Sequence, residues 1–68
     1  MGIFSGQLLQ SPRFEIRKAD DEQYYFVLIA KNGKIIATSE MYENKFGCNN
    51  GIESVKKNAP IAEIIDNY

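Results

Sequence analysis

The chain has 68 residues, 44% of them hydrophobic and 25% charged, with a formal net charge of −1. A domain of this length buries only about 60% of its unfolded surface, so a disulfide, a metal or a second chain usually supplements the core. The single cysteine, Cys48, excludes an intrachain disulfide, and the lack of histidine argues against a structural zinc site. Oligomerisation is the supplement that remains.

The balance of charges also restricts the classes of partner. Eight Lys+Arg against nine Asp+Glu form no basic footprint for nucleic acid or an anionic membrane. No apolar run approaches the ~20 residues that span a bilayer, and the first residues lack the basic and apolar regions of a signal peptide. We expect a soluble, cytoplasmic protein with no membrane partner and no nucleic-acid partner.

The chain divides into a lead-in, residues 1–12, and one domain, residues 13–68. The favoured interpretation of the lead-in is a partly ordered tail, as is common at chain termini, and the alternative is an arm whose Leu8 and Leu9 dock on a partner. Residues 13–18 alternate apolar and polar side chains, which predicts a half-buried strand. The acidic residues 20–22 then predict a solvated turn, since they lack the ligand spacing of a calcium loop.

The stretch from Gln23 to Ser39 predicts the central hairpin. Residues 23–31 form its long strand and residues 35–38 a third strand. Between them, the pair Asn32-Gly33 predicts a type I′ turn, which needs two residues with positive φ. Alternate side chains of the long strand share a face, and both faces are apolar, so we expect cover on both sides.

One helix is predicted from about Lys45 to Lys57, with Asn44 as its N-cap. An apolar stripe runs through Cys48, Ile52, Val55 and Ala59. Gly47 and Gly51 beside it predict a close approach to the face of the sheet that carries Tyr24 and Phe26. Asn58 is expected to take the left-handed cap conformation before Pro60. Residues 61–68 fit either a short fourth strand near Ala62 to Ile65 or a loose tail.

These elements predict an α+β fold, a three-stranded antiparallel sheet with one helix packed across one face (β-β-β-α). One helix covers one face, so the second face must meet another chain, the lead-in or solvent. The candidate interface residues are Tyr25, Val27, Ile29 and Ile36. The predicted core consists of Phe14, Ile16, Tyr24, Phe26, Leu28, Ile35, Cys48, Ile52 and Val55.

Two segments resemble a known family. The helix region reads KFGCNNGIESVKKNAP over residues 45–60, and the strands carry FEI at 14–16 and NGKIIATSE at 32–40. These segments resemble the YegP-like family of small bacterial proteins. The resemblance implies the same fold, with tandem copies in some members packed as a pseudo-dimer, and hence a homodimer for a single copy. It supplies no catalytic residues. The chain departs from the family at Tyr25, Val27 and Ile29, where Arg or Lys is usual, and we expect this face to be buried.

Three classes of function were weighed. An enzyme would need Cys48 as its nucleophile, but this residue lies on the core stripe and the chain has no histidine base, so we expect no catalysis, metal or cofactor. Tyr24, Tyr25 and Phe26 suggest a stacking platform for nucleic acid, but clustered cations are lacking. We therefore predict a small dimeric protein-interaction or structural module with an unidentified protein partner; the alternative is a nucleic-acid-associated binding protein.

Overall fold

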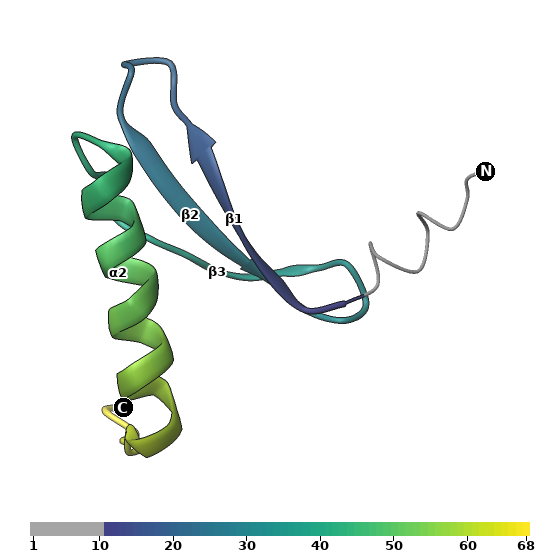
Figure 1. Ribbon diagram of the computed structural model, residues 1–68. Helices are drawn as coiled ribbons and strands as arrows, with labels where there is room; N and C mark the ends of the chain where they lie inside the picture. The colour runs from purple at the N-terminus through teal and green to yellow at the C-terminus, as the bar shows by residue number, and fades with distance from the viewer. Residues whose placement is uncertain (1–10) are drawn as a thin grey trace.

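A computed structural model describes residues 11–68, which form a small sheet and a helix packed across one of its faces (Figure 1). The three strands are antiparallel in the order β1-β2-β3. The predicted fold class is therefore confirmed. No helix in this part of the chain is long and apolar enough to cross a membrane. The elements are β1 (Arg13–Lys18), β2 (Tyr24–Ile29), β3 (Ile35–Thr38), α2 (Lys45–Asn58) and the 3-10 turn η1 (Ala59–Ile61).

Both hairpins close with the same three-residue loop. In the second hairpin, the Ala30 N–H donates to the Lys34 carbonyl at 2.8 Å and the Gly33 N–H donates to the Ala30 carbonyl at 2.9 Å. Within residues 11–68, positive φ occurs only at Glu22 (70°) and Gly33 (86°). Each lies at the last position of its loop, where a left-handed residue follows a turn.

The predicted type I′ turn at Asn32-Gly33 is therefore wrong, although the hairpin is in the predicted place. Asn32 does not adopt positive φ. Its side-chain Oδ1 instead accepts a hydrogen bond from the Lys34 N–H at 3.0 Å. In turns, asparagine side chains often bond in this way to the backbone two residues later. The longer loop also explains why β2 stops at Ile29 rather than Lys31, since residues 30 and 31 belong to the turn.

β3 contains a bulge that sequence alternation did not predict. Leu28 pairs with Ala37, but the next residue of β2, Ile29, pairs with Ile35, so Ile36 is the extra residue. The bulge breaks the alternation of faces that would have placed Ile35 in the core. Ile35 is 49% exposed. The prediction of Ile35 as a core residue is therefore wrong.

α2 begins as predicted. The Asn44 side chain caps it, because Oδ1 accepts the Gly47 N–H at 2.8 Å. Its end differs from the prediction. Asn58 remains right-handed (φ −93°, ψ −32°), and the helix tightens into η1, which accommodates Pro60 in its first turn. The side-chain amide of Asn58 donates to the Ser54 carbonyl at 2.8 Å instead of forming a left-handed cap.

The core lies between α2 and the facing side of the sheet. Phe26, Cys48 and Ile52 are buried at its centre, and the partly buried residues Phe14, Ile16, Tyr24, Tyr42 and Val55 pack around them. All of these except Tyr42 were predicted. Tyr42 belongs to the connection before α2, where its N–H and carbonyl pair with the backbone of Tyr24 at 2.7 and 2.8 Å. Its ring stacks on Phe26 with centroids 6.2 Å apart.

The two helical glycines differ in their surroundings. A Cβ at Gly51 would overlap the Tyr42 hydroxyl and lie 3.0 Å from Phe26 Cε2, whereas a Cβ at Gly47 would meet nothing closer than 3.4 Å. The predicted close approach is thus found at Gly51, and its main neighbour is Tyr42 rather than Tyr24. The stripe also ends earlier than predicted, because Ala59 is exposed in η1.

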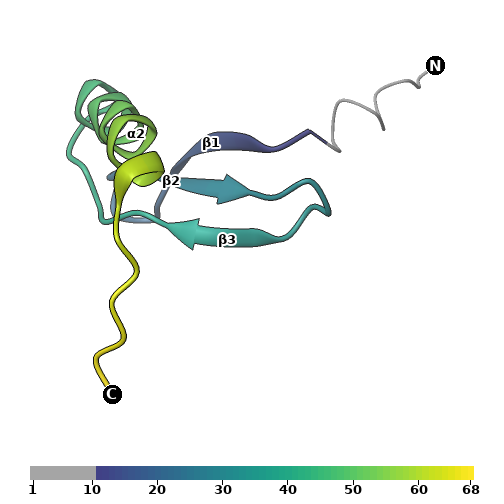
Figure 2. The ribbon, with the colours of Figure 1, turned by 90° about the horizontal axis from the view of Figure 1, so that it is seen from below.

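The C-terminal tail, residues 62–68, forms no strand. Ala62 has extended backbone angles (φ −74°, ψ 134°), and the tail leaves α2 on the β3 side of the sheet and runs beyond it (Figure 2). Of the two alternatives for this segment, the structure has the unpaired tail. The predicted lead-in falls mostly on residues 1–10, outside the described residues.

Candidate interaction surface

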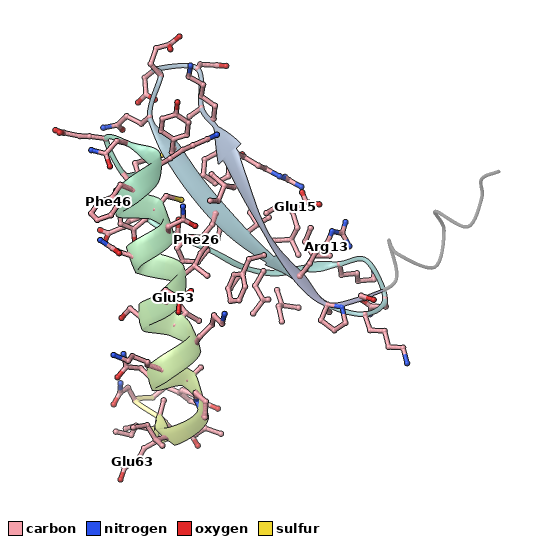
Figure 3. All side chains as sticks on the ribbon, viewed as in Figure 1. Arg13, Glu15, Phe26, Phe46, Glu53 and Glu63 are labelled. Carbon is pink, nitrogen blue, oxygen red and sulfur yellow. The ribbon has the colours of Figure 1, made fainter. Side chains whose placement is uncertain are left out.

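The face of the sheet opposite α2 carries a charged row from β1. Glu15 lies between two arginines and accepts from Arg13 Nε at 2.8 Å and from Arg17 Nη2 at 2.9 Å (Figure 3). These hydrogen bonds, the one from Arg13 first, hold the pKa of the Glu15 carboxyl below its usual range. The same carboxylate raises the pKa of Arg17, with a smaller contribution from Tyr25. Because Glu15 bonds to both guanidinium groups and partly neutralises their charge, this row attracts an anion less strongly than two arginines alone would.

The four predicted interface residues differ in exposure. Val27 and Ile29 are only 1% and 3% exposed, Tyr25 is half-buried, and Ile36 is 63% exposed. Val27 lies in register between Glu15 and Thr38 at the centre of the sheet. Ile36 therefore offers the largest surface of the four. That these residues meet a partner stays a prediction.

Large exposed apolar side chains occur on β3 and, separately, on η1 and the tail. We call this set the β3–tail rim: Ile35, Ile36, Ile61, Ile64, Ile65 and Tyr68. Ile64 is 96% exposed and Ile65 is 67% exposed. β3 is an edge strand, since β2 is its only neighbour in the described sheet. A free strand edge beside exposed apolar side chains is a template for pairing with another chain.

Charges of opposite sign flank the rim. The loop before β3 carries Lys31 and Lys34, and the tail carries Glu63 and Asp66. All four residues are exposed, and none has an ion-pair partner among residues 11–68. The basic loop and the acidic tail could therefore form ion pairs with each other only across a contact between two chains or after the tail moves.

A second exposed apolar site lies at the start of α2. Phe46 is 76% exposed and points away from the sheet (Figure 3), and Met41 in the preceding connection is 48% exposed. On the helix, Phe46 is about half a turn from the buried Cys48. These two residues lie outside the β3–tail rim.

The candidate nucleophile, Cys48, and the groups that could hold a metal ion have the following surroundings among residues 11–68. Cys48 is fully buried, and burial raises the pKa of its thiol. A protonated thiol without a base is a poor nucleophile. Within residues 11–68, no three His, Cys, Asp or Glu side chains gather to hold a metal ion, and no pocket is enclosed.

Sequence reasoning missed Tyr42 and Phe46, and it left the tail open between a short strand and a loose tail. The signal for the tail was its apolar density, with three isoleucines in five residues from Ile61 to Ile65. That density fitted either a short strand or a loose tail, and among residues 11–68 no strand pairs with it. Tyr42 and Phe46 carried no signal, because neither belongs to a periodic apolar pattern.

Comparison with known proteins decides the family. A family model described as a domain of unknown function (DUF1508) matches residues 19–66. The chain belongs to this family. It is 50% identical over 54 residues to a UPF0339 protein of Treponema denticola, and the match covers 79% of this chain and 93% of that relative. The resemblance to YegP-like proteins is therefore confirmed.

Two further members show how this chain relates to others in size and shape. The chain is 48% identical over 50 residues to the UPF0339 protein YegP of Escherichia coli, and spans only 46% of that relative's length. An NMR solution structure of a protein from Haloferax volcanii superposes with a TM-score of 0.76 at 38% identity, covering 82% of this chain and 95% of the other. The family thus includes members of about one domain and members more than twice as long as the match.

Proposed function

We propose that this DUF1508 domain is a homodimeric protein-binding module and not an enzyme, and that its two copies associate through the β3–tail rim. The observation that carries the proposal is the rim itself: among residues 11–68, neither the tail nor the outer edge of β3 is paired, and both expose isoleucine side chains. In the proposed dimer, the tail of each copy lies along β3 of the other. Addition of a strand to a sheet edge is a common mode of recognition between chains.

The dimensions suit this arrangement. Seven extended residues, 62–68, reach about 24 Å, whereas the four residues of β3 need about 14 Å. The tail can therefore pair with all of β3 and still reach the adjoining loop. Ile64 and Ile65 would point to opposite faces of the added strand. One side chain would then extend the helix-covered face of the sheet and the other would join Ile36.

The energies are of the right order. Full burial of an isoleucine is worth about 1.5–3 kcal/mol. Because these side chains are already partly buried, at 49%, 63%, 96% and 67% exposed for Ile35, Ile36, Ile64 and Ile65, their burial would contribute roughly 4–8 kcal/mol at each contact, and twofold symmetry makes the contact twice. The cost of association is about 4–15 kcal/mol. The apolar contact alone can thus sustain a dimer, and the exposed Lys31 and Lys34 opposite Glu63 and Asp66 would orient it.

The family comparison supports two-copy assembly. Relatives such as the Escherichia coli protein have more than half their length outside the match, which leaves room for a second copy in the same chain. A single-domain chain would reach the same arrangement by pairing with itself. A buried free thiol with no disulfide also suits a reducing compartment, and we place the dimer in the cytoplasm.

Light scattering across a dilution series of the full chain tests the proposal. We expect the mass of two chains at high concentration. We expect the double variant Ile64→Asp/Ile65→Asp to have the mass of one chain, because charged side chains cannot be buried in the contact. The control is Phe46→Asp, which also replaces an exposed large apolar residue but lies outside the rim, and it should remain a dimer. A single-chain mass for the unaltered protein at every concentration would overturn the proposal.

A further inference from the structure

We propose that Asn32 is a site of spontaneous covalent modification, deamidation through a cyclic imide, and that the fold confines this reaction to the β2–β3 loop. The chain has two Asn-Gly pairs, Asn32-Gly33 and Asn50-Gly51. Asparagine followed by glycine is the pair most prone to this reaction, because no side chain hinders the glycine nitrogen. The two pairs have the same local sequence chemistry and different structural surroundings.

The reaction uses only groups of the chain and water. The backbone nitrogen of Gly33 attacks Cγ of Asn32, the new C–N bond closes a five-membered imide, and the Cγ–Nδ2 bond breaks to release ammonia. The proton of the Gly33 N–H leaves to a base in solvent. Water then opens the imide at either carbonyl, giving aspartate or isoaspartate. No oxidation or reduction occurs.

The β2–β3 loop permits this attack. Asn32 and Gly33 are exposed, and outside residues 32–34 no atom lies within 4 Å of the position that a Gly33 Cβ would occupy. Two hydrogen bonds hold the groups involved, from the Gly33 N–H to the Ala30 carbonyl and from the Lys34 N–H to Asn32 Oδ1. Both are bonds of a short exposed loop, and such loops open locally without unfolding the domain.

The fold protects the second pair, Asn50-Gly51, from this reaction. Asn50 is exposed, but Asn50 and Gly51 lie in the middle of α2. The Gly51 nitrogen is part of the helical ladder. Gly51 also packs against Tyr42 and Phe26 of the core. Attack by the Gly51 nitrogen therefore requires the helix to unwind and part of the core to open.

Modification would change the charge at this end of the sheet. It places a carboxylate between Lys31 and Lys34 and takes the net charge from −1 to −2. Isoaspartate would in addition lengthen the backbone of the loop by one carbon. The effect on assembly rests on the proposed function. In that dimer, the new negative charge would repel Glu63 and Asp66 of the partner's tail and weaken the association.

Peptide mapping by mass spectrometry tests the modification. The full chain is incubated at mildly alkaline pH, folded and separately in concentrated urea, and digested with a glutamate-specific protease. That protease places the two pairs in different peptides, 23–40 and 44–53. In the folded protein we expect Asn32 to convert at least about tenfold faster than Asn50, which corresponds to a difference in opening cost of about 1.4 kcal/mol. In urea, the two rates should converge.

Two results would overturn the inference: equal rates at the two sites in the folded protein, or an unmodified Asn32 in folded protein while both sites react in urea. The variant Asn32→Gln is the control, and it should remove the signal from peptide 23–40 only. The dimer is tested separately by light scattering of Asn32→Asp. An unchanged dimer there would argue against the tail contact and leave the modification standing.

Discussion

Replacement of Gly51 by alanine is a direct test of the packing between α2 and the sheet. The added Cβ would overlap the Tyr42 hydroxyl and lie 2.8 Å from Tyr42 Cζ and 3.0 Å from Phe26 Cε2. The Tyr42 ring cannot simply swing away. Its backbone pairs with Tyr24 and its ring stacks on Phe26, so relief requires movement of α2 or of the whole connection.

The magnitude follows from two opposing terms. Alanine stabilises a helix interior by about 1 kcal/mol relative to glycine, and overpacking of a core costs about 1–3 kcal/mol. Because two of the three close atoms belong to one rigid ring, we place the packing cost in the upper part of this range. The expected net loss for Gly51→Ala is about 1–2 kcal/mol of unfolding free energy.

Gly47→Ala is the matched control, one turn earlier on the same helix. Its Cβ would meet Asn44 Oδ1 at 3.4 Å and Tyr42 Cδ1 at 3.5 Å, which are ordinary contacts. This variant should gain up to about 1 kcal/mol from helix propensity. The difference between the two variants therefore isolates the packing term.

Urea unfolding at one fixed protein concentration measures both variants, since any association makes apparent stability concentration-dependent. Tyr42→Phe in the Gly51→Ala background removes the overlapping hydroxyl and should restore part of the loss, as a double-mutant cycle would show. If Gly51→Ala proves as stable as Gly47→Ala, the close approach of α2 to Tyr42 is wrong.

Three further outcomes are expected. Gly33→Ala should lose about 1–2 kcal/mol in urea unfolding, because φ is +86° with no atom nearby, so the cost is conformational alone; an unchanged midpoint would contradict the left-handed loop position. Cys48 in the native protein should resist alkylation by iodoacetamide. Because the pKa of its thiol is raised in the folded protein, the free energy of unfolding should fall as pH rises above the thiol pKa of the unfolded chain, and Cys48→Ala should remove this effect. Glu15 has a lowered pKa in the folded protein, so its contribution to stability is present above its unfolded pKa and is lost as pH falls through the folded pKa. An NMR titration of Glu15 with a midpoint at or above the ordinary glutamate pKa of 4.5 would disprove the shared ion pair.

The local elements could be predicted because the residues that define them are close in sequence. Strand β1, the two hairpins and the start of α2 rest on alternation, turn residues and the Asn44 cap. The errors also have local causes. Asn-Gly suits more than one loop geometry, and the choice between them depends on how the two strands pair beyond the loop.

The candidate site was less predictable. Val27 and Ile29 were interpreted as interface residues because both faces of β2 are apolar; both are buried on the central strand, and their contact with a partner stays a prediction. The position of Ile35 depended on a bulge, which sequence alternation does not report. The tail's isoleucines were visible in sequence, but their exposure follows from where η1 directs the chain.

By itself, the sequence determined a small α+β domain with one helix packed on a three-stranded sheet, since periodicity, capping and turn residues act over a few positions. The resemblance to YegP-like proteins rested on residue identity in two segments. Only the tertiary structure decided that Tyr42 fills the space left by Gly51, that Ile35 and Ile36 lie on an edge strand, and that the tail pairs with no strand among residues 11–68. These features depend on contacts between residues far apart in sequence, where a single-residue shift in pairing moves a side chain from the core to the surface.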